Sequence, residues 1–189
     1  TVHRQPPVSG TITSQTFIDG VVDKGPDKGV IVVLRREAYV QATGDHLATV
    51  GQSIFARGDG GIGSSGAELP AMPSPPERPA DTVLDMPVSP RAALIYRLSG
   101  DVNALHIDPA VARKAGFDRP ILHGLATYGV AAHAILRTFC GMDSARLRSF
   151  DLRFSAPVYP GETVRTEMWR QGEIVSFRGR FADQARAGE

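Results

Sequence analysis

One long apolar segment limits the folds open to this chain more than any other feature of its sequence. Residues 124–140 read GLATYGVAAHAILRTFC, and they are small and apolar on almost every side of a helical projection. Gly141 follows and is typical of a helix end. A helix of this kind is buried on most of its faces. The sequence therefore predicts a long helix over 125–140 that other elements surround.

Three segments after this helix are predicted to be strands. Apolar residues alternate with mostly polar ones at 150–158, at 164–168 and at 175–181, and Pro160-Gly161 marks a turn. Such alternation is typical of a sheet with one wet face. A buried helix followed by a sheet with a single apolar face favours an α+β fold in which the sheet wraps the helix.

A segment rich in glycine, proline and serine divides the chain into two halves. Residues 58–81 are too polar and too often interrupted for a helix or a strand, so we predict a linker there. The first half, 1–57, has no long helix, and its sheet leaves one apolar face in need of a partner surface. The second half is 82–189. The strand-like runs of the first half are 11–22, 30–40 and 47–57.

Composition excludes several classes of protein. Lys plus Arg total 21 and Asp plus Glu total 20, so the net charge of +1 does not supply the basic field of most nucleic-acid-binding proteins. No segment approaches the ~20 apolar residues of a membrane span. Cys140 is the only cysteine, which excludes a disulfide framework or a CxxC site and fits a reducing compartment. We therefore expect neither nucleic acid nor membrane as a partner.

Polar residues that composition does not explain are concentrated between 97 and 124. Asp101 and His106 lie five residues apart in a loop-like stretch, where both side chains can reach one small molecule or one water. Asn103 can hold either of these two side chains in position. A carboxylate and an imidazole can act as a general acid/base pair, because one can give a proton while the other takes one. The alternatives are a turn residue for Asp101 and a structural role for His106.

The other polar residues nearby have simpler interpretations. Asp108 precedes Pro109 and is predicted to cap a short helix. His123 precedes the long helix and can hydrogen-bond backbone there, while His133 lies on that helix and is predicted to be a satisfied core residue. Zinc sites usually show tight pairs such as HExxH or CxxC, which these histidines do not form. No metal site is therefore predicted.

Gly124 is a candidate binding residue at the first turn of the long helix. The backbone N–H groups of that turn lack partners inside the helix, and the positive end of the helix dipole lies there. Both features suit a carbonyl oxygen that acquires negative charge. Without a side chain, Gly124 also lets a substrate approach the backbone closely. The alternative is an ordinary helix start.

The segment 96–129 carries a resemblance to a known family. It reads YRLSGDVNALHIDPAVARKAGFDRPILHGLATYG and resembles the hydratase 2 motif of the MaoC-like family, the (R)-specific enoyl-CoA hydratases and dehydratases of the hot-dog fold. The pattern GD-x-N-x-L-H-x-D-P and the later HGL fall at the family's spacing. The string RFSAPVYPGETV at 153–164 is similar to the family's next strand pair. The first half is similar to the N-terminal part of the two-hot-dog, eukaryotic-type members.

The resemblance implies a fold, a reaction and a set of site residues. The implied fold is an α+β hot dog, a long central helix wrapped by a curved antiparallel sheet, near-complete in the second half and partial in the first. The implied acid/base dyad is Asp101 and His106, with Asn103 as the orienting residue. The backbone amide of Gly124 is the implied thioester-binding group. The implied reaction is reversible syn addition of water to trans-2-enoyl-CoA, giving (3R)-3-hydroxyacyl-CoA in fatty-acid or related acyl metabolism.

The same resemblance implies partners and a location. The expected substrate is a thioester of coenzyme A or of an acyl carrier protein, with no metal or redox cofactor. The chain is expected to be a homodimer in the cytoplasm, or in peroxisomes if it is eukaryotic. The alternatives are a non-catalytic acyl-thioester-binding scaffold and a thioesterase. The acid/base pair argues against a scaffold, which has no physical use for it.

The chain is also expected to be shortened relative to that family. It begins at Thr1 rather than at a methionine, after segments that precede the three strands of the family's first hot dog. The last strand of the second hot dog is expected to be missing after Ala182.

Overall fold

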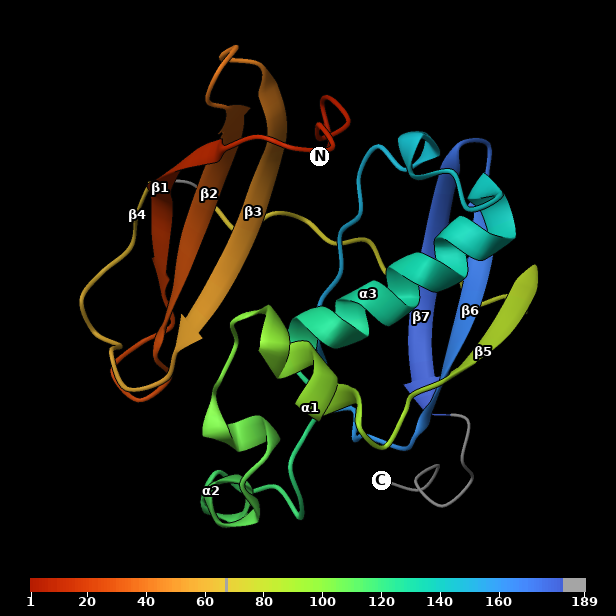
Figure 1. Ribbon diagram of the computed structural model, residues 1–189. Coiled ribbons are helices and arrows are strands. Elements are labelled where there is room, and N and C mark those ends of the chain that lie inside the picture. The colour runs from red at the N-terminus through yellow and green to blue at the C-terminus, as the bar shows by residue number, and fades with distance from the viewer. Residues whose placement is uncertain (67, 182–189) are drawn as a thin grey trace. The chain divides into compact units, whose positions relative to one another are not determined.

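Two compact units make up the computed structural model, which describes residues 1–66 and 68–181 (Figure 1). Unit 1 consists of Thr1–Met72 and Ala145–Phe150, and unit 2 consists of Pro73–Ser144 and Asp151–Glu189. Each unit holds one antiparallel sheet, with strand order β3-β2-β1-β4 in unit 1 and β5-β6-β7 in unit 2. The expectation about the chain after Ala182 lies outside the described residues.

Unit 1 contains a meander of three long strands. β1 (Ile12–Asp23), β2 (Val30–Val40) and β3 (His46–Ala56) pair in sequence order. Each bound lies within one residue of the predicted run, so these strand predictions are confirmed. The turns between them contain Gly29 and Gly44, whose φ angles of 74° and 72° are in the left-handed region that favours glycine.

A fourth strand in this sheet is short and was not predicted. β4 (Ser65–Gly66) lies within 58–81, so the prediction that this segment holds no strand was wrong at these two residues. Gly66 pairs with Gly20 of β1. A side chain at Gly66 would collide with the carbonyl oxygen of Asp19, so glycine permits this close pairing.

Unit 2 combines a three-stranded sheet with short and long helices. Its strands are β5 (Thr82–Pro87), β6 (Thr163–Gln171) and β7 (Ile174–Phe181). Its α-helices are α1 (Ala92–Tyr96), α2 (Pro109–Lys114) and α3 (Gly124–Ile135). The remaining turns are η1 (Arg97–Ser99), η2 (Ala104–His106), the π-helical η3 (Leu136–Cys140) and η4 (Ser144–Arg146), the last shared between the two units. None of the described helices is long and apolar enough to cross a membrane.

The predicted long helix is present as α3 followed without a break by η3. Gly141 ends it with a φ of 59°, as expected of a glycine after a helix. In Figure 1, α3 crosses one face of the sheet of unit 2. Asp108 caps α2 as predicted, because its carboxylate accepts hydrogen bonds from the amides of Ala110 and Val111.

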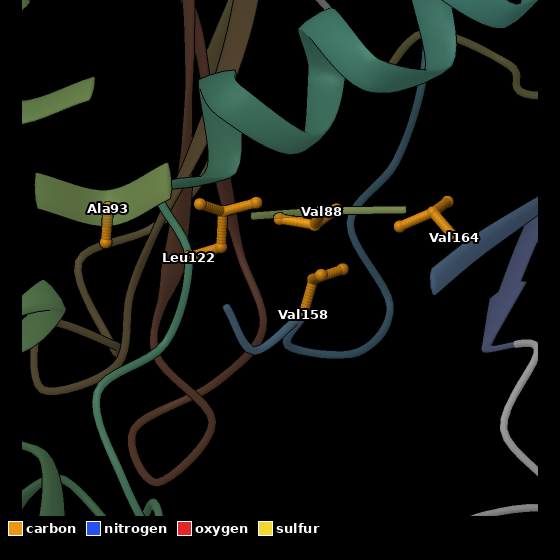
Figure 2. Packing of buried hydrophobic residues seen from close by; sticks show 5 residues of the cluster. All are labelled: Val88, Ala93, Leu122, Val158 and Val164. Carbon is orange, nitrogen blue, oxygen red and sulfur yellow. The ribbon is translucent and has the colours of Figure 1, made fainter. Parts of the chain in front are cut away.

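The core of unit 2 lies between α3 and this sheet. Figure 2 shows the cluster at its centre, formed by Val88, Ala93, Leu122, Val158 and Val164. Ala126 and Val130 of α3 pack against it. Met168 is fully buried in β6 and alternates in phase with Val164, as the sequence pattern predicted. Full burial of a side chain of this size contributes about 1.5–3 kcal/mol.

The segment 150–158 is not a strand, so the prediction of three closing strands was wrong at the first of them. Its alternation does not separate inward-facing from outward-facing residues either, since Val158 is buried but Phe154 is 52% exposed. A strand also needs a ladder of hydrogen bonds to a neighbouring strand. In the described part of the chain this segment has no such ladder, and Val158 O instead accepts a bond from the Leu122 amide at 2.7 Å.

α3 is less buried than the sequence predicted. Ala131, Ala134 and Ile135 are buried, but Leu125 is 64% exposed and His133 is exposed as well. The prediction that His133 is a core residue was therefore wrong. An almost uniformly apolar helix does not indicate which side is covered, and here the sheet packs against one side only.

Candidate functional site

Three polar side chains meet beside the first turn of α3. One carboxylate oxygen of Asp101 and one ring nitrogen of each of His106 and His123 lie within 4.8 Å of one another. Asp101 is exposed, whereas His106 and His123 are only 9% and 1% exposed. The structure thus brings together Asp101 and His106, the pair singled out in the sequence, and adds His123 to them.

Polar side chains shape the loop that carries this pair. Gly100 begins it with a φ of 111°, which favours glycine. The carboxylate of Asp101 accepts a hydrogen bond from the main-chain N–H of Asn103 at 3.3 Å. Asp101 therefore forms a turn as well as facing the histidines. Asn103 Oδ1 in turn accepts from the Leu105 amide at 3.1 Å and caps η2. Asn103 therefore holds the turn at whose end His106 lies.

The ring of His106 is held from two directions. Its Nδ1 lies 2.9 Å from the carbonyl oxygen of Ile121. A carbonyl oxygen only accepts, so Nδ1 carries a proton and, in the neutral ring, Nε2 keeps its lone pair. The ring also stacks on His123, with 3.8 Å between centroids and 27° between planes. Nε2 is thus the atom of His106 available for proton transfer.

His123 was expected to hydrogen-bond backbone at the start of the long helix, but it provides no side-chain cap there and joins the cluster instead. Its Nε2 donates a hydrogen bond to the main-chain oxygen of Asp101 at 3.1 Å, which leaves Nδ1 as the unprotonated nitrogen. Nδ1 is buried and has no hydrogen-bond partner. Tyr96 covers the ring, with 4.8 Å between centroids. The HGL string shows that His123 precedes Gly124 in the chain. Nothing in the sequence relates His123 to Asp101, which lies 22 positions earlier.

Burial lowers the pKa of His123 below its ordinary value of 6.5. The hydrogen bond with the Asp101 backbone acts in the opposite direction, and the neighbouring charge of His106 lowers the pKa further. The ring of His123 is therefore neutral at pH 7. Its single ring proton stays on the bond to Asp101.

The neutral state of His123 predicts a pH dependence of stability. Because its pKa is lower in the folded chain than in the unfolded chain, the unfolded chain binds more protons below 6.5. We expect the free energy of unfolding to fall as the pH drops below 6.5, and to fall less in a His123→Gln variant, whose amide keeps a donor for the Asp101 oxygen. Urea unfolding of both proteins on either side of that pH measures the difference. Equal losses in the two proteins would contradict the assignment.

Gly124 begins α3 immediately after His123 and is exposed. The first amides of a helix have no partner within it, and the helix dipole is positive there. His123 precedes it in an extended conformation, with φ of −56° and ψ of 138°, and provides no side-chain cap. A Cβ at Gly124 would lie 3.5 Å from the Phe154 ring, an ordinary contact. The first turn of α3 thus offers N–H donors beside the Asp101, His106 and His123 cluster.

The arrangement suits acid/base chemistry next to a polarised carbonyl. The carboxylate of Asp101 and Nε2 of His106 can hold one water and exchange protons with it. An amide at the first turn of α3 can donate to an oxygen that becomes negatively charged. The buried face of the histidines reduces competition from bulk water, which strengthens these interactions.

Residues 71–186 match the family model described as a MaoC like domain. The chain belongs to this family. The matched residues include the loop with Asp101 and His106, as well as the whole of α3. The family resemblance read from residues 96–129 is therefore confirmed.

Relatives of this MaoC-like chain include a protein named as a dehydratase and one named as a multifunctional enzyme. The 3-hydroxyacyl-thioester dehydratase Y of Mycobacterium tuberculosis is 44% identical over 89% of the chain, which covers 59% of that relative. The peroxisomal multifunctional enzyme type 2 of Mus musculus is 41% identical over 94% of the chain, which covers 24% of it. The chain thus spans less than two thirds of the length of these relatives.

Solved structures confirm the predicted fold. The crystal structure of a MaoC-like dehydratase from Phytophthora capsici matches 97% of the chain with a TM-score of 0.89 and 39% identity, and the chain covers 64% of it. A Mycobacterium tuberculosis protein described as a double hot-dog fold matches with a TM-score of 0.63 at 18% identity. The MaoC-like chain therefore has the α+β hot-dog fold expected from its sequence.

Proposed function

We propose that this MaoC-like chain catalyses the reversible hydration of trans-2-enoyl-CoA to (3R)-3-hydroxyacyl-CoA, or the reverse dehydration. The observation that carries this proposal is the meeting of the Asp101 carboxylate and the His106 ring within 4.8 Å beside the first turn of α3. An acid/base pair and a carbonyl-binding donor are the groups that addition of water to an unsaturated thioester requires.

In the proposed reaction, a water held by Asp101 and His106 attacks C3 of the enoyl group. One member of the pair removes a proton from the water as its oxygen bonds to C3. The electrons of the double bond move toward the thioester oxygen, whose developing charge is stabilised by the Gly124 N–H. C2 then receives a proton on the same face, which gives syn addition. We assign the roles of proton donor and proton acceptor to the pair as a whole.

Asn103 and His123 are proposed as positioning residues. Asn103 caps the turn that carries His106, and His123 donates to the backbone of Asp101 while stacking on the His106 ring. Each therefore fixes a member of the dyad without taking part in proton transfer. Near-attack geometry of this kind contributes strongly to rate, because the reacting groups no longer have to be ordered during reaction.

The proposed chemistry needs no metal or redox cofactor, because it moves protons and adds water without transferring electrons to another group. The acyl carrier, coenzyme A or an acyl carrier protein, is part of the substrate.

A second copy of the chain is the proposed partner, since hot-dog sheets have edges that can pair. The proposed location is the cytoplasm, or peroxisomes in a eukaryotic cell, in keeping with a relative named as a peroxisomal enzyme.

Hydration assays test the proposal directly. The full chain is expected to consume crotonyl-CoA and longer trans-2-enoyl-CoA substrates, which is measured as loss of the conjugated enoyl absorbance. Chiral analysis is expected to identify the product as the (3R) form. Free thiol is measured in parallel, because release of coenzyme A would indicate a thioesterase instead. Formation of the (3S) product, or substrate binding without turnover as a scaffold would show, would overturn the proposed function.

A further inference from the structure

The ring of Phe154 packs against Gly124, the residue whose amide is the proposed thioester-binding donor. The three ring carbons farthest from the backbone, Cζ, Cε1 and Cε2, lie 3.5–3.8 Å from the position that a Cβ on Gly124 would take. The Cα–Cβ bonds of a helix tilt toward its N-terminus, and the N–H groups of the first turn point in the same direction. The ring therefore lies on the side of Gly124 from which a thioester oxygen would approach the amide.

The segment that carries Phe154 runs along this side of α3. Tyr128 lies four residues after Gly124 and therefore on the same side of the helix. Burial raises the pKa of the Tyr128 hydroxyl, and the negative charge of Asp151 raises it further. Asp151 thus lies near Tyr128 while Phe154 lies against Gly124, so the segment approaches α3 at two points one helical turn apart.

Much of the Phe154 side chain stays uncovered despite this contact. Phe154 is 52% exposed, and two more exposed apolar side chains adjoin site residues in the chain, since Leu125 follows Gly124 and Val102 follows Asp101. Single exposed apolar residues are common on protein surfaces. Apolar side chains around a few polar groups are instead typical of a ligand site. The surface beside the proposed donor therefore suits a ligand with an apolar part.

An acyl thioester has two arms of different polarity on either side of its carbonyl group. The acyl chain is a hydrocarbon, whereas the arm of the carrier contains amide groups. Contact with a phenyl ring removes hydrocarbon from water, which is favourable, but it would leave amide groups without hydrogen-bond partners. The ring of Phe154 therefore favours the acyl arm.

We propose that Phe154 is a specificity-determining residue that packs against the first carbons of the acyl chain, and that it makes the site prefer an acyl thioester to the free carrier. This inference rests on the proposed function, which places the thioester oxygen at the Gly124 N–H. Because the ring lies beside the first turn of α3, its contact is with carbons close to the carbonyl group, which substrates of every chain length share.

Calorimetric titration of the full chain measures this contact without turnover. Octanoyl-CoA is the probe, because its saturated chain cannot be hydrated, and free coenzyme A is the reference for the carrier arm. Phe154→Ala is expected to weaken octanoyl-CoA binding by about tenfold and to leave the affinity for coenzyme A unchanged. Phe154→Gln, which keeps a long side chain but ends it in a polar group, is expected to show a similar loss.

Steady-state kinetics gives a second measurement of the same contact. Because the contact is made equally by bound substrate and by the transition state, Phe154→Ala is expected to raise KM for crotonyl-CoA and for longer enoyl-CoA substrates by a similar factor, with kcat nearly unchanged. A merely structural role of Phe154 would instead lower the fraction of active protein, and with it kcat, for every substrate.

Phe55→Ala is the matched control, because Phe55 is 46% exposed and lies in β3 of unit 1, whereas the site lies in unit 2. It is expected to bind both probes like the unsubstituted chain. Unchanged octanoyl-CoA affinity in the Phe154 variants overturns the inference, and so does an equal loss for coenzyme A, which would place the ring on the carrier arm. Hydration with binding that does not depend on Phe154 refutes this inference alone. Phe154-dependent binding of octanoyl-CoA without hydration of crotonyl-CoA refutes the proposed function alone.

Discussion

Asp101→Asn and His106→Asn are each expected to lower the rate of enoyl-CoA hydration by about 10²–10⁴, the usual contribution of a general acid or base. Asparagine at 101 keeps an oxygen that can accept from the Asn103 amide, so the turn remains. Asparagine at 106 keeps a donor near the position of Nδ1 for the Ile121 oxygen but removes Nε2. The loss is expected in kcat rather than in substrate binding, and steady-state kinetics of folded protein measures it.

Asp108→Asn is the matched control for the Asp101 variant. It makes the same carboxylate-to-amide change seven residues away, at a helix cap where asparagine is as good as aspartate. We expect it to keep both fold and activity. His133→Asn serves in the same way for His106, because His133 is exposed on α3. If a dyad variant keeps the turnover of its control while remaining folded by circular dichroism, the acid/base assignment is wrong.

The sequence indicates the elements of the fold where local signals and tertiary packing agree. The three strands of unit 1 have strong β-propensity between turn residues, and their bounds could be predicted to within one residue. The segment 150–158 has the same alternation but no strand ladder, because pairing depends on a neighbour that periodicity does not describe. The short strand β4 was missed for the opposite reason, since Gly66 joins a sheet through close backbone approach without any strand propensity.

The candidate site could be located but not completed from the sequence. Asp101 and His106 lie close together along the chain, so their meeting follows from a short loop. His123 joins them only because α3 begins beside that loop, and this contact depends on the packing of unit 2. The tautomers of both histidines are likewise set by the carbonyl oxygens of Asp101 and Ile121, which a sequence pattern does not show.

Gly124→Pro is expected to lower hydration by about 10²–10³, the usual effect of removing one donor to a developing oxyanion. Proline lacks the N–H but is well tolerated at the first position of a helix, because that amide has no partner within the helix. The residue before proline must be extended, and His123 already is, with φ of −56° and ψ of 138°. The substitution thus removes one proposed catalytic donor from a site where the backbone accommodates it.

Gly124→Ala separates loss of the N–H from the addition of a side chain. It keeps the amide, and its Cβ would lie 3.5 Å from the Phe154 ring, a contact that needs no rearrangement. Alanine also favours the helical state over glycine, so α3 is not weakened. We expect Gly124→Ala to retain far more activity than Gly124→Pro, with thermal unfolding close to that of the unsubstituted chain in both. Equal activity in the two variants would show that the Gly124 amide does not bind the thioester oxygen, and another donor at the first turn of α3 would have to take that role.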